Sequence, residues 1–429
     1  MDNNNKMEKI VSLAKRRGFV FLGSEIYGGL AGTWDYGPLG AELLHNIKEA
    51  WWNKFVNGYD DIYGLASSII MPEAVWRASG HLEGFVDPLV ECLKCKKRYK
   101  ADQFDEKKCP DCGGDFGEEK PFNTMFPVEM GSTEKGSNTA YLRGELAQGM
   151  FVNFKNIVDS FHPKLPFGIA QIGKCFRNEI SPRDFLFRVR EFDLMEFEYF
   201  IREENWEEVF EFWRKEMWNW IEEVGLNKDK VHELEVAKED LAHYSKRTID
   251  FEYDFPFGRK ELYGLAYRTD HDLKNHKLDY YDEEKKETFT PHVVEPTFGA
   301  GRTVLAVLCE AYSEDEMGGE KRVFLKLKPQ IAPVKVAIFP LLKNKPELME
   351  KAKEIYGEIK KEIPSAVFDS SGNIGKRYRR QDEIGTPFCI TVDFDTLEKD
   401  SVTVRDRDTG EQERVDVKTI SEYLKNRLK

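Results

Sequence analysis

The chain has 429 residues, of which 41% are hydrophobic and 33% are charged, and its formal net charge is −13 at pH 7. This length exceeds what one hydrophobic core supports, so we expect two or three domains. No apolar run approaches the ~20 residues that span a bilayer, and the first residues lack a signal-peptide core with a cleavage site. We therefore expect a cytoplasmic protein that does not contact a membrane.

The first predicted elements are a long helix and a short strand. Residues 39–56 carry apolar side chains at helical spacing: Leu43, Ile47, Trp51 and Phe55. Pro38 stands at the entrance of this helix, where its missing N–H costs nothing. The apolar stretch LASSIIMPEAVW follows and contains Pro72, which should end a strand or lie at a sheet edge.

The next segment, residues 85–120, differs in composition and holds two CxxC pairs: Cys92, Cys95, Cys109 and Cys112. Each CxxC turn presents two thiolates to one side, and two such turns complete a tetrahedral sulfur site for Zn²⁺. Four metal-free thiols or a redox CxxC are the alternatives, but a redox site needs only one pair. We predict a zinc-ribbon insertion at about 88–118, with structural zinc because four protein ligands leave no open position.

Helical spacing returns in residues 141–161 and 206–224, and the apolar stripe of the second segment indicates core rather than a cofactor site. Between them, two strands are expected, joined by a turn near Ser181-Pro182-Arg183. The second strand alternates, with one apolar face and one face that bears Arg188, Arg190, Phe192, Leu194, Glu196 and Glu198. Arginines suit phosphate and a ring among them suits a stacked base, so we predict a nucleotide site.

The last third of the chain begins with the strands expected in RKELYGLAYRTDHDL and HVVEP, followed by a glycine turn and a buried helix. Pro329 to Pro333 is interpreted as a linker. Strands and helices then alternate, which predicts a small α/β domain at 331–429. One helix there carries a basic cluster, Lys376, Arg377, Arg379 and Arg380, which could contact nucleic acid or equally form a solvated surface.

Five stretches in order resemble class II aminoacyl-tRNA synthetases, and among them the dimeric, eukaryotic and archaeal-like glycyl-tRNA synthetases. They are GTWDYGPLGAEL, YLRGELAQGMF, LPFGIAQIGKCFRNEISPR, LYGLAYRTDHDL and HVVEP. The three class II motifs are matched by IIMPEAVWRASGH, by FRNE with RVREF, and by EPTFGAGR. The resemblance runs from about Met7 to the C-terminus. It implies an α+β fold, with a catalytic domain at 1–330 built on an antiparallel sheet flanked by helices, and an anticodon-binding domain at 331–429.

The resemblance also implies site residues. Arg177 would hold the α-phosphate of ATP, and Arg188 and Arg302 its outer phosphates, which makes these three the expected catalytic residues. Glu179 would contact the adenine, Phe192 would stack on it, and Glu261 would lie near ATP and its Mg²⁺. The full expected ATP site is Arg177, Asn178, Glu179, Phe187, Arg188, Phe192, Glu261, Leu262, Gly299, Gly301 and Arg302.

For glycine, the resemblance implies that three carboxylates surround the ammonium and that Arg268 takes the carboxylate or a phosphate. The expected glycine site is Lys100, Glu145, Phe192, Glu196, Arg268, Glu295 and Thr297. Lys100 stands where the family usually has arginine, and Thr297 where serine is common. The basic cluster at 376–380 is expected to contact the anticodon arm of the tRNA.

The activity that the resemblance implies is a ligase that converts glycine and ATP to glycyl adenylate and transfers glycine to the 3′ end of tRNA(Gly). A homodimer with ATP, Mg²⁺ and structural Zn²⁺ is expected. One alternative is a class II synthetase of another specificity, which the glycyl-type stretches oppose. The other is a catalytically silent, synthetase-like tRNA-binding protein, which the presence of Arg177, Glu179 and Arg302 opposes.

Overall fold

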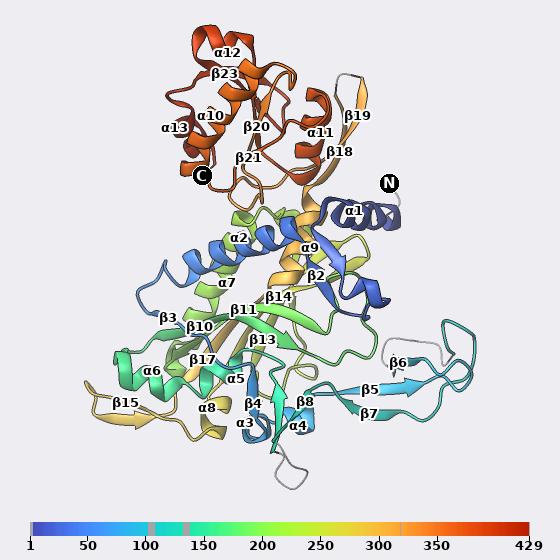
Figure 1. Cartoon of the computed structure of the whole chain (residues 1–429). Helices are drawn as coiled ribbons and strands as arrows, with labels where there is room; N and C mark the ends of the chain where they lie inside the picture. The colour runs from blue at the N-terminus through green and yellow to red at the C-terminus, as the bar shows by residue number, and fades with distance from the viewer. Residues whose placement is uncertain (1–2, 102–107, 132–137, 318, 429) are drawn as a thin grey trace.

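The computed structural model describes residues 3–101, 108–131, 138–317 and 319–428. The chain forms a large body around one long sheet, and a smaller C-terminal body lies above it (Figure 1). Among the described residues, no helix combines the length and apolar composition that crossing a membrane requires.

The large body is organised by a seven-stranded sheet whose order is β12-β13-β14-β17-β11-β10-β3. Its neighbours pair antiparallel, except that β3 joins β10 in parallel. The bounds are Val231–Glu235 (β12), Arg247–Phe255 (β13), Gly258–Thr269 (β14), His292–Gly299 (β17), Glu191–Ile201 (β11), Phe167–Phe176 (β10) and Ile62–Gly64 (β3). The predicted antiparallel sheet flanked by helices is confirmed.

One detail of the predicted alternating strand is wrong. Strand β11 begins at Glu191, so Arg188 and Arg190 precede it rather than lying on its face. The loop between β10 and β11 turns back through Asp184 and Phe185, whose φ values of 59° and 58° are left-handed. These arginines therefore lie in a loop at the end of the sheet, while Glu196 and Glu198 do share one strand face.

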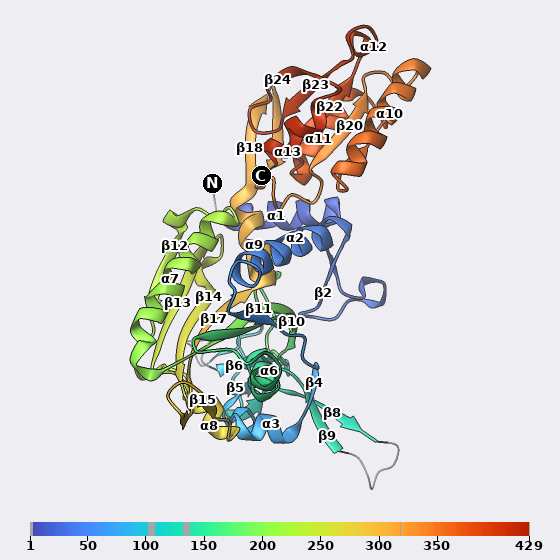
Figure 2. The same ribbon diagram turned by 90° about the vertical axis from the view of Figure 1, so that its left-hand side faces the viewer.

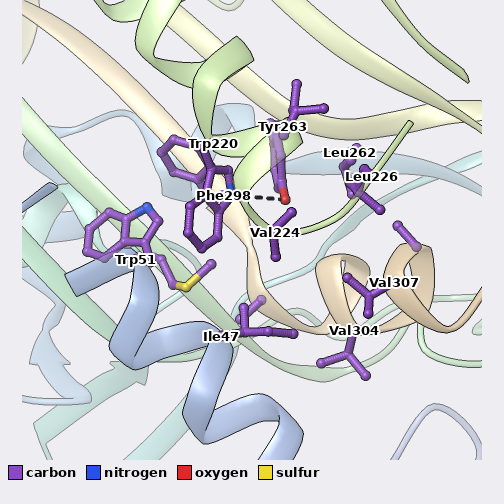
Figure 3. Close-up of a cluster of buried hydrophobic side chains, with 14 of the residues drawn as sticks. Ile47, Trp51, Trp220, Val224, Leu226, Leu262, Tyr263, Phe298, Val304 and Val307 are labelled. Atoms are coloured by element: carbon purple, nitrogen blue, oxygen red, sulfur yellow. Dashed lines mark hydrogen bonds between the residues drawn. The ribbon is translucent and has the colours of Figure 1, made fainter. Parts of the chain in front are cut away.

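Three helices cover one face of the sheet: α2 (Pro38–Phe55), α7 (Trp206–Glu223) and α9 (Ala300–Ala311). Helix α1 (Asn3–Arg17) packs against α9 on the side towards the C-terminal body. Figure 3 shows how Trp51 of α2 and Trp220 of α7 meet Phe298 of β17 in a dry aromatic core. Trp220 Nε1 donates a hydrogen bond of 3.1 Å to Tyr263 Oη, so the buried indole N–H is satisfied. This packing supports the central strands on the face that the helices cover.

The opposite face is partly covered by shorter helices: α5 (Ala147–Phe151), α6 (Phe154–Phe161) and α8 (His271–Asn275). Their core contains Phe154, Phe167 and Phe200, whose ring centroids lie 4.7 to 5.8 Å apart. The predicted helical segment at 141–161 is only partly right, because β9 (Asn138–Leu142) pairs there with β4 (Ile70–Pro72) and β8 (Phe126–Met130). Strand β4 ends at Pro72, as predicted, and α3 (Glu73–Ala78) begins directly after it.

The cysteine-bearing segment projects from the large body as a three-stranded sheet of order β6-β5-β7 (Figure 1). Its strands are β5 (Val86–Glu91), β6 (Arg98–Lys100) and β7 (Lys120–Asn123). The remaining short elements of the large body are β1 (Val20–Leu22), η1 (Glu25–Tyr27), β2 (Trp34–Tyr36), α4 (His81–Gly84), η3 (Glu203–Asn205), η4 (Lys228–Lys230), β15 (Tyr280–Asp282) and β16 (Glu287–Phe289).

The C-terminal body has a five-stranded sheet of order β21-β20-β22-β23-β24, flanked by four helices. The strands are β20 (Val336–Pro340), β21 (Val367–Phe368), β22 (Phe388–Val392), β23 (Ser401–Asp406) and β24 (Gln412–Asp416). The helices are α10 (Pro346–Glu362), α11 (Ile374–Ile384), α12 (Phe394–Lys399) and α13 (Ile420–Arg427). The predicted alternation is found, but the β23–β24 hairpin was missed, although Asp408-Thr409-Gly410 between its strands is a turn sequence.

The two bodies are joined by buried contacts. Ile331 and Ala332 are 2% and 0% exposed in the core of the large body, so the predicted linker at 329–333 is packed rather than free. A hairpin of β18 (Tyr312–Met317) and β19 (Glu320–Leu325) extends against α11. There Arg405 donates to both oxygens of Asp382 at 2.8 and 3.1 Å, and Arg322 Nη1 lies 3.5 Å from the same carboxylate.

We predict that Asp382→Ala destabilises the C-terminal body and its contact with the β18–β19 hairpin, because Arg405 of β23 loses its buried carboxylate and Arg322 of β19 loses the carboxylate that it approaches. Breaking a buried ion pair in this way costs about 3–5 kcal/mol. Thermal unfolding and limited proteolysis measure the loss. Asp395→Ala is the control, since the Asp395 carboxylate on α12 is exposed and pairs with Lys399 on the surface. Equal stability of both variants would show that this buried group of charges does not stabilise the C-terminal body or its contact with the hairpin.

Candidate active site

A cavity of about 600 Å³ opens on the face of the sheet that the long helices leave free. It is lined by most of the residues that the resemblance implies: Lys100, Glu145, Arg177, Glu179, Phe187, Arg188, Phe192, Glu196, Glu261, Leu262, Glu295, Thr297, Gly299, Gly301 and Arg302. Within the described residues, Asn178 and Arg268 lie outside this lining. The cavity also contains residues to which sequence reasoning gave no role, including Asp250 and Tyr244.

The floor of the cavity is formed by three neighbouring strands. The register of β11 with β17 places Glu196 opposite Thr297, and β14 places Gly264 on the other side of Thr297. A side chain at Gly264 would meet nothing within 4 Å, so this glycine keeps open space in the cavity. Because side chains alternate along strands, residues two apart on β11 and β17 face the same cavity.

Arginine and aromatic side chains form one half of the cavity. The Arg177 guanidinium carbon lies 4.9 Å from the ring centre of Phe85 and 5.4 Å from that of Phe192, and its Nε donates to Gly144 O at 3.1 Å. Arg302 lies 4.5 Å from the ring centre of Phe187. Arginines held against aromatic rings provide fixed cationic forks, which suit the phosphates of a nucleotide.

Two acidic residues accompany these arginines. Arg302 Nη1 lies 3.1 Å from Glu261 Oε2. Burial raises the pKa of Glu261, but the Arg302 guanidinium outweighs this effect and holds the pKa below its ordinary value. Burial and the charge of Glu261 raise the pKa of Asp250 to about 7. Both carboxylates line the same cavity, so a cation bound between them would relieve their repulsion.

Buried glutamates form the other half. Glu145, Glu196 and Glu295 are 8%, 1% and 7% exposed. Carboxylate oxygens of Glu196, Glu198 and Glu295 all lie within 4.8 Å of one another. Burial, and then the neighbouring Glu295, raise the pKa of Glu196, and burial is the main reason that the pKa of Glu295 rises to about 7. A small cation would therefore be bound favourably here.

Sequence reasoning missed the residues that hold Glu145. His81 Nε2 lies 3.2 Å from Glu145 Oε2, and His81 Nδ1 is 2.8 Å from Ser79 Oγ. Gln148 Nε2 donates to Glu145 Oε1 at 3.0 Å. Burial opposes ionisation, but His81, Arg268 and Gln148 together hold the pKa of Glu145 well below its usual range. The spacing of three between Glu145 and Gln148 was a usable signal, whereas nothing in the sequence linked the distant His81 to this carboxylate.

Arg268 lies beneath the glutamates rather than in the cavity lining. It is 1% exposed, and it donates to Asp272 at 2.8 Å and to Glu295 Oε1 at 2.9 Å. Its Nη2 has no hydrogen-bond partner among the described residues and lies 3.9 Å from Glu145 Oε1. Arg268 thus supplies the buried positive charge that keeps this group of carboxylates together.

The four cysteines of the insertion come together at the end of its small sheet. Their sulfur atoms lie within 4.8 Å of one another, with Sγ–Sγ distances of 3.5 Å for Cys92–Cys112 and 3.6 Å for Cys95–Cys109. Four sulfurs at about 2.3 Å from a central Zn²⁺ would be about 3.8 Å apart, so the donor set fits a tetrahedral zinc ion. A Cβ at Gly114 would lie 3.1 Å from Cys92 Sγ and 3.3 Å from Cys112 Sγ, so glycine leaves room for the sulfurs.

The basic cluster of α11 is more buried than its sequence suggests. Arg377 is 1% exposed and donates to the carbonyl oxygens of Pro340, Ser370 and Gly372. Arg380 pairs with Asp369 at 2.6 Å and Arg379 Nη2 lies 3.4 Å from Glu320. Lys376 is exposed. The guanidinium of Arg377 therefore anchors a loop, and Lys376 is the member best placed to reach a partner.

Comparisons with known proteins agree with this geometry. Residues 128–312 match the family model described as the tRNA synthetase class II core domain (G, H, P, S and T), and residues 335–427 match that of the anticodon binding domain. A protein of Clostridium acetobutylicum named glycine–tRNA ligase is 47% identical over all of both chains. Glycine–tRNA ligases of Caldanaerobacter subterraneus and Streptomyces coelicolor are each 48% identical, over 99% of this chain and 98% or 99% of theirs.

These relatives are bacterial, so the comparisons support the family and not the narrower eukaryotic and archaeal-like type that the sequence suggested. The class II core model falls within the large body and the anticodon-binding model within the C-terminal body. The similarity to the relatives extends over the whole chain. The chain therefore belongs to the glycine–tRNA ligase family of class II aminoacyl-tRNA synthetases.

Proposed function

We propose that this cavity binds ATP in its arginine-lined half and glycine in its glutamate-lined half, and that the enzyme joins glycine to the 3′ end of tRNA(Gly). The observation that carries the proposal is the group of buried carboxylates that adjoins Arg177 and Phe192 within one cavity. A nucleotide and a small amino acid placed there lie end to end. This is the arrangement that adenylate formation requires.

In the first step, a carboxylate oxygen of glycine attacks the α-phosphorus of ATP. The new bond is a mixed anhydride in glycyl adenylate, and the bond to the leaving pyrophosphate breaks. Arg177 would neutralise the charge that develops on the α-phosphate, with Arg188 and Arg302 on the outer phosphates. Fixed charges in a site shielded from water stabilise such a transition state without reorganisation. In the second step, a terminal ribose hydroxyl of the tRNA takes the glycyl group and AMP leaves.

Glycine is selected by charge and by space. Its ammonium group would be held by Glu145, Glu196 and Glu295, whose burial makes an unpaired anion costly. A larger amino acid would need room for a side chain beside Thr297, which carries a methyl group that serine lacks. Since a hydrophobic pocket discriminates poorly between small side chains, exclusion by lack of space is the available mechanism.

Mg²⁺ is the metal that class II synthetases use with ATP, and it prefers carboxylate oxygens. Glu261 and Asp250 line the phosphate half of the cavity, and we propose that they would hold it. Bound there, the ion would supply additional neutralisation of phosphate charge. Independently of the ion, Arg302 pairs with Glu261 and lines the same cavity.

Three further proposals concern the assembly. The insertion would bind structural Zn²⁺ through its four cysteines, and the C-terminal body would contact the anticodon arm. A homodimer would form around β4 and β8, where Ile70 and Met130 are 45% and 49% exposed and thus available for burial in a twofold interface. The enzyme would work in the cytoplasm, as expected of an enzyme that charges tRNA for translation.

The roles of Arg177 and Glu196 predict different defects. Arg177→Ala should lower the rate of glycyl adenylate formation by roughly 10²–10³, the usual cost of losing one transition-state donor. Glu196→Gln should raise KM for glycine more than it lowers kcat, because the ammonium carries the same charge throughout the step. Pyrophosphate-exchange kinetics with glycine and ATP varied separately measure both.

Matched controls exist on the same elements. Arg183 lies in the loop of Arg177 but outside the cavity lining, and Glu191 lies on β11 but pairs with Lys174 at the surface. Arg183→Ala and Glu191→Gln should behave like the unchanged enzyme. Identical defects in Arg177→Ala and Glu196→Gln would contradict the division of the cavity into two halves.

The raised pKa of Glu295, about 7, predicts how glycine binding depends on pH. Below that pH the carboxyl group is protonated and cannot pair with the ammonium, and above it the carboxylate is ionised. KM for glycine should therefore fall as pH rises from about 6 to about 8, by at most tenfold per pH unit for each proton displaced. A KM for glycine that rises over this range, with KM for ATP constant, would contradict the assignment.

The zinc proposal predicts close to one equivalent of zinc per chain in protein purified without chelator. Cys109→Ser should lose the metal and destabilise the insertion, and so displace Lys100, which the insertion carries into the cavity. Cys389→Ser, a buried cysteine in the C-terminal body, is the control and should keep its zinc. A protein that contains no zinc and retains full activity would contradict the proposal of a structural zinc ion.

The tRNA proposal predicts that Lys376→Ala weakens binding of tRNA and lowers the slope of log Kd against log salt concentration by about 1, as loss of one phosphate contact does. Glycine-dependent pyrophosphate exchange should not change, because Lys376 lies in the C-terminal body. Lys353→Ala on α10, also exposed, is the control. An unchanged salt slope for Lys376→Ala would place the tRNA elsewhere.

A further inference from the structure

Glu198 is a buried acidic side chain to which the mechanism above gives no role. It is 0% exposed, and neither of its carboxyl oxygens has a hydrogen-bond partner among the described residues. Glu196 Oε1 is likewise buried without a partner. A buried charged oxygen without a partner is costly, so two such groups next to each other require a physical explanation.

The position of Glu198 relates it directly to the proposed glycine site. It lies two residues after Glu196 on β11 and therefore on the same face of the sheet. The register that pairs Glu196 with Thr297 and Tyr199 with Val294 places Glu198 opposite Glu295 of β17. One oxygen from each of these three glutamates lies within 4.8 Å of the others, which is within reach of a hydrogen bond after a side-chain rotation.

The charges that surround Glu198 do not balance it. Glu196 faces it from its own strand and Glu295 from β17, while Asp272 of α8 adds a further negative charge. Arg268 of β14 is the nearby cation, but it already donates to Asp272 and Glu295. Gln171 and Ile169, on the neighbouring strand β10, bring no charge. Burial and the neighbouring Glu295 accordingly raise the pKa of Glu198 well above its ordinary value.

We propose that Glu198 is a neutral carboxylic acid whose O–H donates a hydrogen bond to Glu196 Oε1 and so positions the Glu196 carboxylate for the glycine ammonium. One proton then satisfies two buried oxygens that otherwise have no partner. The hydrogen bond leaves Oε2 of Glu196 for the substrate and fixes the carboxylate plane. Glu198 is thus a positioning residue that acts through Glu196, and its part in glycine binding rests on the proposed function.

The same proton limits the charge of the site. If Glu196, Glu198 and Glu295 were all ionised, three anions would share a space that Arg268 only partly neutralises, and a divalent cation would be bound in preference to an ammonium. With Glu198 neutral, the negative charge beside Arg268 is lower, and it suits a single ammonium group better than a divalent ion. The neutral acid therefore contributes to the choice of a monovalent, hydrogen-bonding cation over a metal ion.

Two substitutions test the hydrogen bond. Glu198→Met keeps the length of the side chain but removes the donor, and it should raise KM for glycine by about 10-fold or more, since hydrogen bonds to charged groups are among the stronger ones. Glu198→Gln supplies an N–H in place of the O–H and should recover most of that loss. KM for ATP and the thermal midpoint report whether either variant is merely misfolded.

Three outcomes would overturn the proposal. A KM for glycine in Glu198→Gln as high as that in Glu196→Gln would show that Glu198 is an anion that binds the ammonium directly. A Glu198→Met variant with unchanged KM would show that the side chain only fills space. A lower KM for glycine in both variants would show that Glu198 opposes binding by charge.

Infrared difference spectroscopy tests the protonation state without relying on turnover. At about pH 9, where Glu295 and Asp250 are ionised because their pKa values are about 7, the unchanged enzyme should still show the C=O stretch of a protonated, buried carboxyl group, and Glu198→Gln should lack that band. The same band in both proteins would contradict the proposal even if the enzyme activates glycine. Conversely, the band present in an enzyme without glycine-dependent exchange would leave the neutral Glu198 intact and refute the proposed function instead.

Discussion

The site depends on one electrostatic constraint, which is that several carboxylates are buried together under a single cavity. Glu145, Glu196, Glu198 and Glu295 are at most 8% exposed, and Arg268 is the buried cation among them. A fold that removes carboxylates from water must either protonate them or supply positive charge. The structure does some of each: His81, Arg268 and Gln148 hold the pKa of Glu145 low, while burial favours a proton on the adjacent Glu196 and Glu198, which we propose resides on Glu198. Under the proposed function, the ammonium group of glycine would balance the negative charge that remains.

The rest of the large body can be understood as support for that arrangement. The strands that carry the glutamates, β11 and β17, are central in the sheet, and α2, α7 and α9 pack an aromatic core against their far side (Figure 3). A close-packed core resists changes in register, and a slip of one residue would turn the glutamates of the slipped strand to the other face of the sheet. The arginines, by contrast, come from loops and a helix start at the end of the sheet, where Arg177 and Arg302 are steadied by aromatic rings. Under the proposed function, the central strands would position the amino acid, and the loops and the helix start at the end of the sheet would contact the nucleotide.

The sequence predicted local features of the fold well, and it did not predict features that depend on tertiary contacts. Patterns that are local in the chain were informative: the helix at 39–56, the end of β4 at Pro72, the paired CxxC turns and the strand–glycine–helix at 292–311 are all found. Features that depend on distant contacts were not accessible. His81 meets Glu145 only through the tertiary fold. Charge alone could not show that Arg377 is buried against carbonyl oxygens, or that residues 331 and 332 pack into the core instead of forming a free linker. The resemblance to a family placed most cavity residues together, but it did not reveal Glu198, whose importance lies in its lack of a partner.

The central claim is that buried carboxylates select an amino acid that offers an ammonium group and no side chain. ATP–pyrophosphate exchange with each of the twenty amino acids, at concentrations well above the KM for glycine, tests it most directly. The account predicts exchange with glycine, with alanine and serine lower by a factor of 100 or more, roughly what exclusion of a single small group can achieve. Exchange with alanine or serine at a rate similar to that with glycine would contradict the claim. The carboxylates would then bind any small amino acid, and the cavity would not exclude a side chain.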